Sequence, residues 1–305
     1  MTLRTQLLTR CLPAALMVCP LLSAPALATS FGAGIENSQW YLTESVFECA
    51  LVHQVPGYGR ATFRHRAGES LLFSLEADTP LMRPGRGMLV VEAPSWRPGV
   101  PPRPLGLVTV PEGRSAVVLS AAQSMQVAYG LLDGLSPTLT QQSWFNAQPV
   151  RVHVSNINFS PPFQGYRTCA GNLLPANFDQ LQGSQILFAS ASVALNDADR
   201  LSLDKVVAYV LADSTVNTVL VDGHTDRTGS RIDNRKLAQD RAEAVAGYLK
   251  SRGVPESKIV VRAHGDQFAG LGNPAEDRRV VIRMEREGDS IEWQQASATP
   301  EPGAG

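Results

Sequence analysis

The feature that most constrains the fold of this chain is a strand, turn and helix pattern over residues 215–252. Residues 216–221 are largely apolar and β-branched and are followed by an Asp-Gly pair, which predicts a buried strand. Ser230 and Asp233 then fit a capping box, which predicts a helix that runs to Gly253. The apolar stripe of this helix, at helical spacing, consists of Leu237, Ala238, Val245, Tyr248 and Leu249.

Two polar residues, Asn234 and Arg241, lie within that stripe and are predicted to point inward. An arginine keeps its charge, so burying it without a partner costs several kcal/mol or more. We therefore expect an anionic partner for Arg241, and Asp226 in the preceding turn is the nearest candidate. One interpretation is a structural ion pair between Asp226 and Arg241. The other is a binding pair, in which Asp226 takes a ligand ammonium and Arg241 takes a ligand carboxylate.

The motifs of this stretch read Thr-Asp, Gly, Asn, Leu, Arg-Ala and Tyr-Leu at fixed spacings. In this respect residues 185–284 resemble the OmpA-like peptidoglycan-binding domain. The family's two ligand-contacting side chains fall on Asp226 and Arg241. Thr225 and Asn234 belong to the same motif, and we include them in the predicted site. The resemblance implies binding of diaminopimelate in the wall peptide, whose side chain ends in an ammonium and a carboxylate, and it favours the binding pair.

Parts of this domain depart from the family pattern. The first strand is followed by Ala-Ser-Ala-Ser at 189–192, where the family often has an acidic or amide residue. The loop after the third strand has His-Gly-Asp at 264–266 in place of Gly-Tyr-Gly-Glu. We expect a changed pocket rim, and a structural pair between Asp277 and Arg278 or Arg279.

The remaining pattern of residues 185–287 predicts a two-layer α/β sandwich in the order βαβαββ. Asn196 or Asp197 is expected to cap its first helix. The apolar stripe of that helix is Leu203, Val206, Val207, Val210 and Leu211. The four strands are expected at 185–188, 216–221, 259–263 and 279–284.

Residues 29–174 have a different pattern, in which short strands alternate with turn residues. This predicts an all-β domain of the sandwich or barrel-like kind, with one helix at 120–132. A transmembrane barrel is disfavoured because the strands are short, contain prolines and lack paired aromatic girdles. The expected strands cover 46–54, 61–66, 70–75, 88–93, 107–110, 116–119 and 150–154.

Residues 1–28 have a basic start, an apolar stretch and an Ala-Leu-Ala end, which predicts a cleaved secretory signal. An uncleaved anchor is disfavoured because the apolar stretch is too short to span a bilayer. Without this segment the chain has 25 basic and 28 acidic residues, which gives no electrostatic footprint for nucleic acid. It also has two cysteines, Cys49 and Cys169, for which export favours a disulfide over two free thiols.

Short motifs in the N-terminal half, with the domain order and the two cysteines, resemble the N-terminal domain of the MotY family of the flagellar motor T-ring. The motifs are Trp40-Tyr41, Phe47-Glu48-Cys49, Gly59-Arg60-Ala61-Thr62-Phe63, Ala67-Gly68-Glu69 and Tyr166-Arg167-Thr168-Cys169. The resemblance implies a periplasmic protein, in a ring-forming assembly, that docks on basal-body ring proteins and helps to recruit stator units. The alternative is an OmpA-like envelope-integrity protein unrelated to motility.

Catalytic signatures are not found in the sequence, which has no Gly-x-Ser-x-Gly elbow, P-loop or dinucleotide fingerprint. We therefore expect a protein that is not an enzyme and uses no cofactor. His224 and His264 with Asp226 make a poor metal site, and no nucleophile joins them to support a wall hydrolase. The expected organisation is a signal at 1–28, a docking domain at 29–174, a linker at 175–184, a wall-binding domain at 185–287 and a disordered tail at 288–305.

Overall fold

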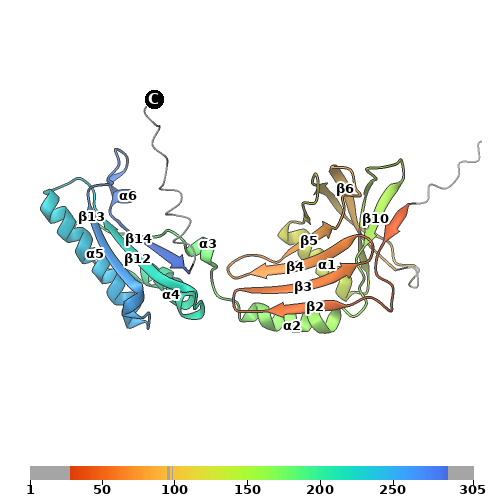
Figure 1. Cartoon of the computed structure of the whole chain (residues 1–305), viewed down its shortest axis with the longest axis horizontal. Coiled ribbons are helices and arrows are strands. Elements are labelled where there is room, and N and C mark those ends of the chain that lie inside the picture. Colours follow the sequence, from red (N-terminus) through yellow and green to blue (C-terminus); the bar gives the residue numbers. More distant parts are fainter. Residues whose placement is uncertain (1–27, 95–96, 98, 288–305) are drawn as a thin grey trace, which may run out of the picture.

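The computed structural model describes residues 28–94, 97 and 99–287, and Figure 1 shows two domains side by side along the long axis. The expected secretory signal, apart from Ala28, and the expected tail at 288–305 lie outside the described residues. The predicted fold class is confirmed: the N-terminal domain is built on β-sheets and the C-terminal domain is α/β. Within the described ranges, no helix has both the length and the apolar character needed to cross a membrane.

Two five-stranded sheets form the N-terminal domain. One is antiparallel with the order β2-β3-β4-β5-β8, and the other has the order β1-β10-β9-β6-β7 with β1 and β10 parallel. A single apolar core includes residues of both sheets, among them Phe63 and Leu139. The strands are β1 (Thr29–Phe31), β2 (Trp40–Glu44), β3 (Glu48–Val55), β4 (Gly59–Arg66), β5 (Leu72–Ala77), β6 (Gly85–Glu92), β7 (Arg103–Val110), β8 (Val117–Val118), β9 (Ser136–Gln142) and β10 (Pro149–His153).

Three of these strands, β1, β2 and β9, were not expected from the sequence. Strand β9 contains Pro137 and mostly polar side chains, so its local pattern is weak, and tertiary pairing with β6 and β10 decides its conformation. Helix α1 (Ala121–Leu132) lies where it was expected, and Ser120 caps it.

Helix α2 (Ser160–Gly171) was also not expected, because it contains two prolines and two glycines. The prolines lie in its first turn, where a missing N–H removes no helical hydrogen bond. Three buried side chains at spacings of three, Phe163, Tyr166 and Cys169, hold the helix on the domain core.

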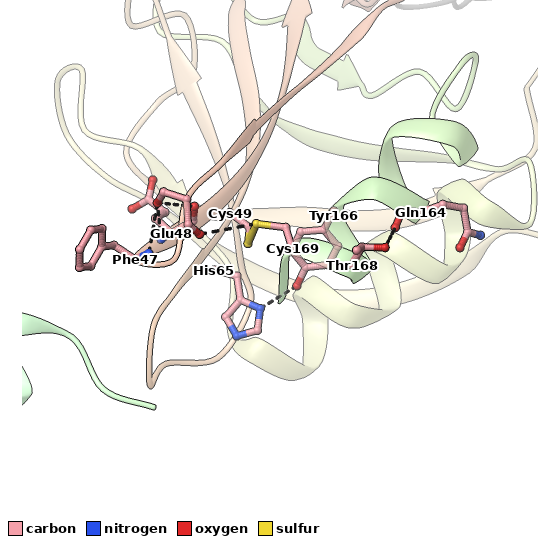
Figure 2. Close-up of a disulfide and its surroundings, with 9 residues drawn as sticks. Phe47, Glu48, Cys49, His65, Gln164, Tyr166, Thr168 and Cys169 are labelled. Carbon is pink, nitrogen blue, oxygen red and sulfur yellow. Dashed lines mark hydrogen bonds between the residues drawn. A yellow bond between two sulfur atoms is a disulfide. The ribbon is translucent and has the colours of Figure 1, made fainter. Parts of the chain in front are cut away.

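The disulfide between Cys49 and Cys169 is confirmed, and it joins β3 to α2 with a Cα–Cα distance of 6.1 Å. Figure 2 shows it beside His65, whose Nδ1 lies 2.8 Å from the Tyr166 hydroxyl. Both cysteines are buried. The bond links residues 120 positions apart, so it ties the last helix of this domain to one of its first strands.

The C-terminal domain has the predicted order βαβαββ. Its sheet has the order β11-β14-β12-β13, in which only β12 and β13 are parallel. Side chains of α4 and α5 form one core with β12 and β14. Leu211 is exposed, and Tyr209 takes the inward position in α4 instead, so the predicted stripe is wrong at Leu211. The elements are β11 (Ser184–Leu187), α4 (Asp197–Ala212), β12 (Val216–His224), α5 (Arg231–Ser251), the 3₁₀ turn η1 (Glu256–Lys258), β13 (Ile259–Gly265), α6 (Pro274–Asp277) and β14 (Arg279–Arg286).

The stretch expected as a linker, 175–184, contains helix α3 (Phe178–Leu181) and contacts both domains. Asn177 caps α3, and its Nδ2 donates to the carbonyl of Ala67 at 3.0 Å and to Glu69 at 2.7 Å. From the N-terminal domain, Phe47 packs against the C-terminal core. These contacts fix how the polypeptide passes from one domain to the other.

Candidate functional site

Arg241 lies on the inward face of α5 and is 0% exposed, as its place in the stripe predicted. Its guanidinium donates hydrogen bonds to three backbone carbonyls, those of Ser192 at 2.9 Å, Ala189 at 3.0 Å and His224 at 3.3 Å. Burial, together with the positive charge of Arg278, lowers the pKa of Arg241 from its ordinary value. The buried charge is therefore stabilised mainly by oriented peptide dipoles.

The segment 189–192 that provides two of these carbonyls is at the surface, and residues 189–191 are exposed. The Phe188 ring lies under the guanidinium, with 5.3 Å from the Arg241 Cζ to the ring centroid, which is a cation–π contact. Ala191 has a φ of 54°, in the left-handed region that residues other than glycine rarely adopt. The contacts of this segment to Arg241 are made by its backbone and do not depend on its side chains.

Asp226 lies in the turn between β12 and α5 and is nearly buried, with 9% exposure. Its Oδ2 forms an ion pair of 3.0 Å with Nη1 of Arg278, and its Oδ1 accepts a hydrogen bond from the Thr228 N–H at 3.0 Å. Burial by itself would raise the pKa of Asp226, but the bonds from Arg278 and Thr228 outweigh it and lower the pKa. Asp226 is therefore ionised at neutral pH.

Of the two interpretations made from the sequence, the structural ion pair between Asp226 and Arg241 is wrong. Asp226 pairs with Arg278, and Arg241 is bonded to carbonyls. The expectation failed because it considered only a carboxylate as the partner of a buried guanidinium, whereas peptide oxygens also accept its hydrogen bonds. Asp277 is 3.6 Å from Arg279, which agrees with one of the two structural pairs expected for it.

Arg278 is the site residue that sequence reasoning missed. In the sheet, Val280 of β14 lies opposite Gly223 of β12, so the residues before Val280 lie beside the turn that follows Gly223. This antiparallel register brings the Arg278 side chain to Asp226. The charged residues 276–279 before the last strand were visible in the sequence. Only the register between β12 and β14 shows that they lie beside the turn that contains Asp226.

Three buried polar atoms around these charges have no hydrogen-bond partner: Thr225 Oγ1, Asn234 Nδ2 and His224 Nδ1. Thr225 is 2% exposed and Asn234 is 4% exposed. Buried polar groups are nearly always hydrogen-bonded, so unpaired ones indicate a place for water or a ligand. Two of the three belong to the site predicted from the sequence.

His224 and His264 stack, with 4.9 Å between ring centroids. Burial, with the nearby charges of Arg279 and His264, lowers the pKa of His224 to about 4, so His224 is neutral at pH 7. His264 Nε2 lies 3.1 Å from Asp222 Oδ1. No group of three or more His, Cys, Asp or Glu side chains in the described part of the chain is arranged to hold a metal ion.

Comparison with known proteins finds a family match for each domain. Residues 31–175 match the MotY N-terminal domain, and residues 187–283 match the OmpA family. The chain is 29% identical over 264 residues to the sodium-type flagellar protein MotY of Vibrio parahaemolyticus, a match that covers 82% of this chain and 88% of that protein. It is 35% identical over 105 residues to the outer-membrane lipoprotein YfiB of Pseudomonas aeruginosa, which covers 32% of this chain and 61% of the lipoprotein.

Among solved structures, the C-terminal domain of Helicobacter pylori MotB is similar to this chain at 21% identity with a TM-score of 0.32. The match covers 38% of this chain and 98% of that domain.

Proposed function

Because this chain is a MotY-like protein with a C-terminal domain of the OmpA family, we propose that it is a periplasmic structural protein of the flagellar motor. The C-terminal domain binds peptidoglycan. The N-terminal domain docks on the basal body and supports the recruitment of stator units. The protein acts as an adaptor and not as an enzyme.

The charge balance of the candidate site is the observation that carries this proposal. Arg241 and Arg278 supply two positive charges, and Asp226 supplies one negative charge. The excess positive charge suits a ligand carboxylate, while Asp226 attracts an ammonium. The side chain of diaminopimelate ends in both groups, and the unpaired Thr225 Oγ1 and Asn234 Nδ2 offer further hydrogen bonds.

The hydrogen-bonding capacity of Arg241 is compatible with this ligand. A guanidinium has five N–H donors, and carbonyls take three of them in this structure. Two donors remain for a ligand carboxylate. Because Arg241 is fully buried and the neighbouring residues 189–191 are exposed, access of the ligand to these two donors requires a local movement of that segment.

Binding to purified cell-wall sacculi tests the wall-binding role. We expect the full chain to co-sediment with sacculi that contain diaminopimelate. Sacculi whose wall peptide contains lysine in place of diaminopimelate are the control, because the lysine side chain keeps the ammonium and lacks the second carboxylate. Equal binding to both would contradict recognition by the two arginines, and release of soluble muropeptides would show a hydrolase.

Deletion of the chromosomal gene tests the motor role. We expect cells that assemble flagella but do not swim, because the stator units are not held at the motor. Normal swimming with a leaky envelope would instead support an OmpA-like role in envelope integrity.

A further inference from the structure

A second surface of the C-terminal domain has the properties of a binding site. An open groove of about 1030 Å³ runs between the outer flank of α5 and strand β13. From α5 it is lined by residues that recur along one side of the helix, from Arg231 to Glu243, and from β13 by residues 261–264. Figure 1 shows α5 and β13 on the side of this domain away from the N-terminal domain.

The groove follows the free edge of a strand. Strand β13 is at the end of the sheet and pairs with β12, and no strand in the described chain pairs with its other side. Both alternating sets of β13 side chains line the groove: Val261 and Ala263 from one set, Arg262 and His264 from the other. Since these sets point to opposite faces of the sheet, the groove lies along the strand edge and not over one face. An edge strand presents unpaired backbone N–H and C=O groups to a partner.

The groove is also positively charged. Arg231, Arg235 and Arg262 are exposed and have no ion-pair partner within the ranges that the structure describes. Of the remaining charged residues of the lining, Lys236 pairs with Asp240 at 3.1 Å. The lining thus has an excess of positive charge, whereas the chain as a whole has a net charge of −1.

We propose that this groove binds an extended acidic segment of a partner protein, which adds to the sheet as a strand beside β13. Backbone pairing with the free edge requires a polypeptide, and the three unpaired arginines require acidic side chains. A second copy of this chain is a poor occupant, because pairing two β13 edges would bring the unpaired arginines of both copies together.

On helix α5, the residues of this surface are separate from those of the Asp226 site. The groove residues of α5 lie on the exposed side of the helix, whereas Arg241 and Asn234 lie on its buried side. The two sites can therefore be tested separately by substitutions on one helix.

The probes for the groove are three acetylated ten-residue peptides, whose binding to the full chain is followed by fluorescence anisotropy. The first alternates Glu with Val and Thr, the second has Gln in place of Glu, and the third has the acidic sequence with two central prolines. Proline removes backbone donors and breaks strand pairing but leaves the charge unchanged. At about 3.3 Å per residue, ten residues are long enough to cover the seven of β13.

We expect the acidic peptide to bind and the proline peptide not to bind. We expect the Gln peptide to bind about tenfold more weakly or worse, and the affinity of the acidic peptide to fall as salt rises. Arg262→Glu and Arg235→Glu should each weaken binding about tenfold. Arg167→Glu, which reverses an exposed arginine of α2, is the matched control and should change nothing. Sacculus binding should persist in all three variants.

Four results would overturn the proposal. They are absence of binding by the acidic peptide, equal binding of the proline peptide, binding unaffected by both arginine reversals, and dimerisation of the chain in light scattering that Arg262→Glu abolishes. Thermal melts establish that each variant is folded, and if Arg262→Glu unfolds the domain, Arg235→Glu on the exposed side of α5 provides the test.

Discussion

The Asp226 carboxylate lies 3.0 Å from the guanidinium of Arg278, measured from Oδ2 to Nη1. Arg241, in helix α5, is instead held by backbone carbonyl oxygens, so the two arginines of the site have different roles. Arg278 pairs with one oxygen of the carboxylate, while Arg241 supplies a positive charge that has no carboxylate partner.

Asp226→Asn should abolish co-sedimentation with sacculi and leave the fold intact. The amide keeps the shape of the carboxylate, but it loses the attraction for a ligand ammonium. The cost in stability should be about 1–3 kcal/mol, because Asp226 and Arg278 are largely buried and the amide keeps the shape but not the charge of the pair. Asp240→Asn, at an exposed position of α5, is the matched control. Retained binding by the Asp226 variant would show that the carboxylate does not contact the ligand.

Arg241→Ala should lower both binding and stability. It removes a fully buried side chain and leaves three carbonyls without their donor, so we expect a loss of about 2–4 kcal/mol. Calorimetry of the C-terminal transition measures this loss, with Arg235→Ala on the exposed side of α5 as the control. An unchanged C-terminal melting temperature in Arg241→Ala would mean that the carbonyl contacts do not stabilise the fold.

Removal of the disulfide should destabilise the N-terminal domain. Cys49 and Cys169 are 120 residues apart, and the loss predicted for a loop of this size is about 4 to 5 kcal/mol on the chain-entropy model. The double substitution to Ser should lower the melting temperature of the N-terminal domain in calorimetry and leave that of the C-terminal domain unchanged. An N-terminal melting temperature of the unsubstituted protein that is the same with and without a reducing agent would contradict this.

His224 should make the C-terminal domain less stable in mild acid. Its pKa in the folded protein is about 4, below the ordinary 6.5, chiefly because of burial. Between these pH values the unfolded chain binds a proton that the folded chain does not, so the free energy of unfolding decreases as pH falls through this window. His224→Gln should reduce the pH dependence of the C-terminal melting temperature between pH 7 and 5. An identical pH dependence in both proteins would exclude His224 as the cause.

Asn177→Ala should loosen the junction between the domains. The substitution removes the cap of α3 and the hydrogen bonds to Ala67 and Glu69, which together are worth about 1–3 kcal/mol. Amide hydrogen exchange should rise in residues 67–69 and 177–182. Asn273→Ala, which removes the cap of α6 instead, should leave those amides unchanged. The same exchange in both variants would mean that Asn177 does not couple the domains.

The sequence by itself determined the elements whose patterns are local. The βαβαββ order, the cap of α5 at Ser230 and the inward direction of Asn234 and Arg241 follow from periodicity and capping chemistry, which act over a few residues. The disulfide followed from cysteine count and export, because only two cysteines remained to pair.

Tertiary structure alone decided the partners of the buried charges. The register of β14 against β12 brings Arg278 to Asp226, and the segment 189–192 gives its carbonyls to Arg241. Packing also decided α2 and β9, whose prolines and polar residues weaken the local signal. These features depend on contacts between residues far apart in the chain, and a pattern read along the chain has no information about which distant groups meet.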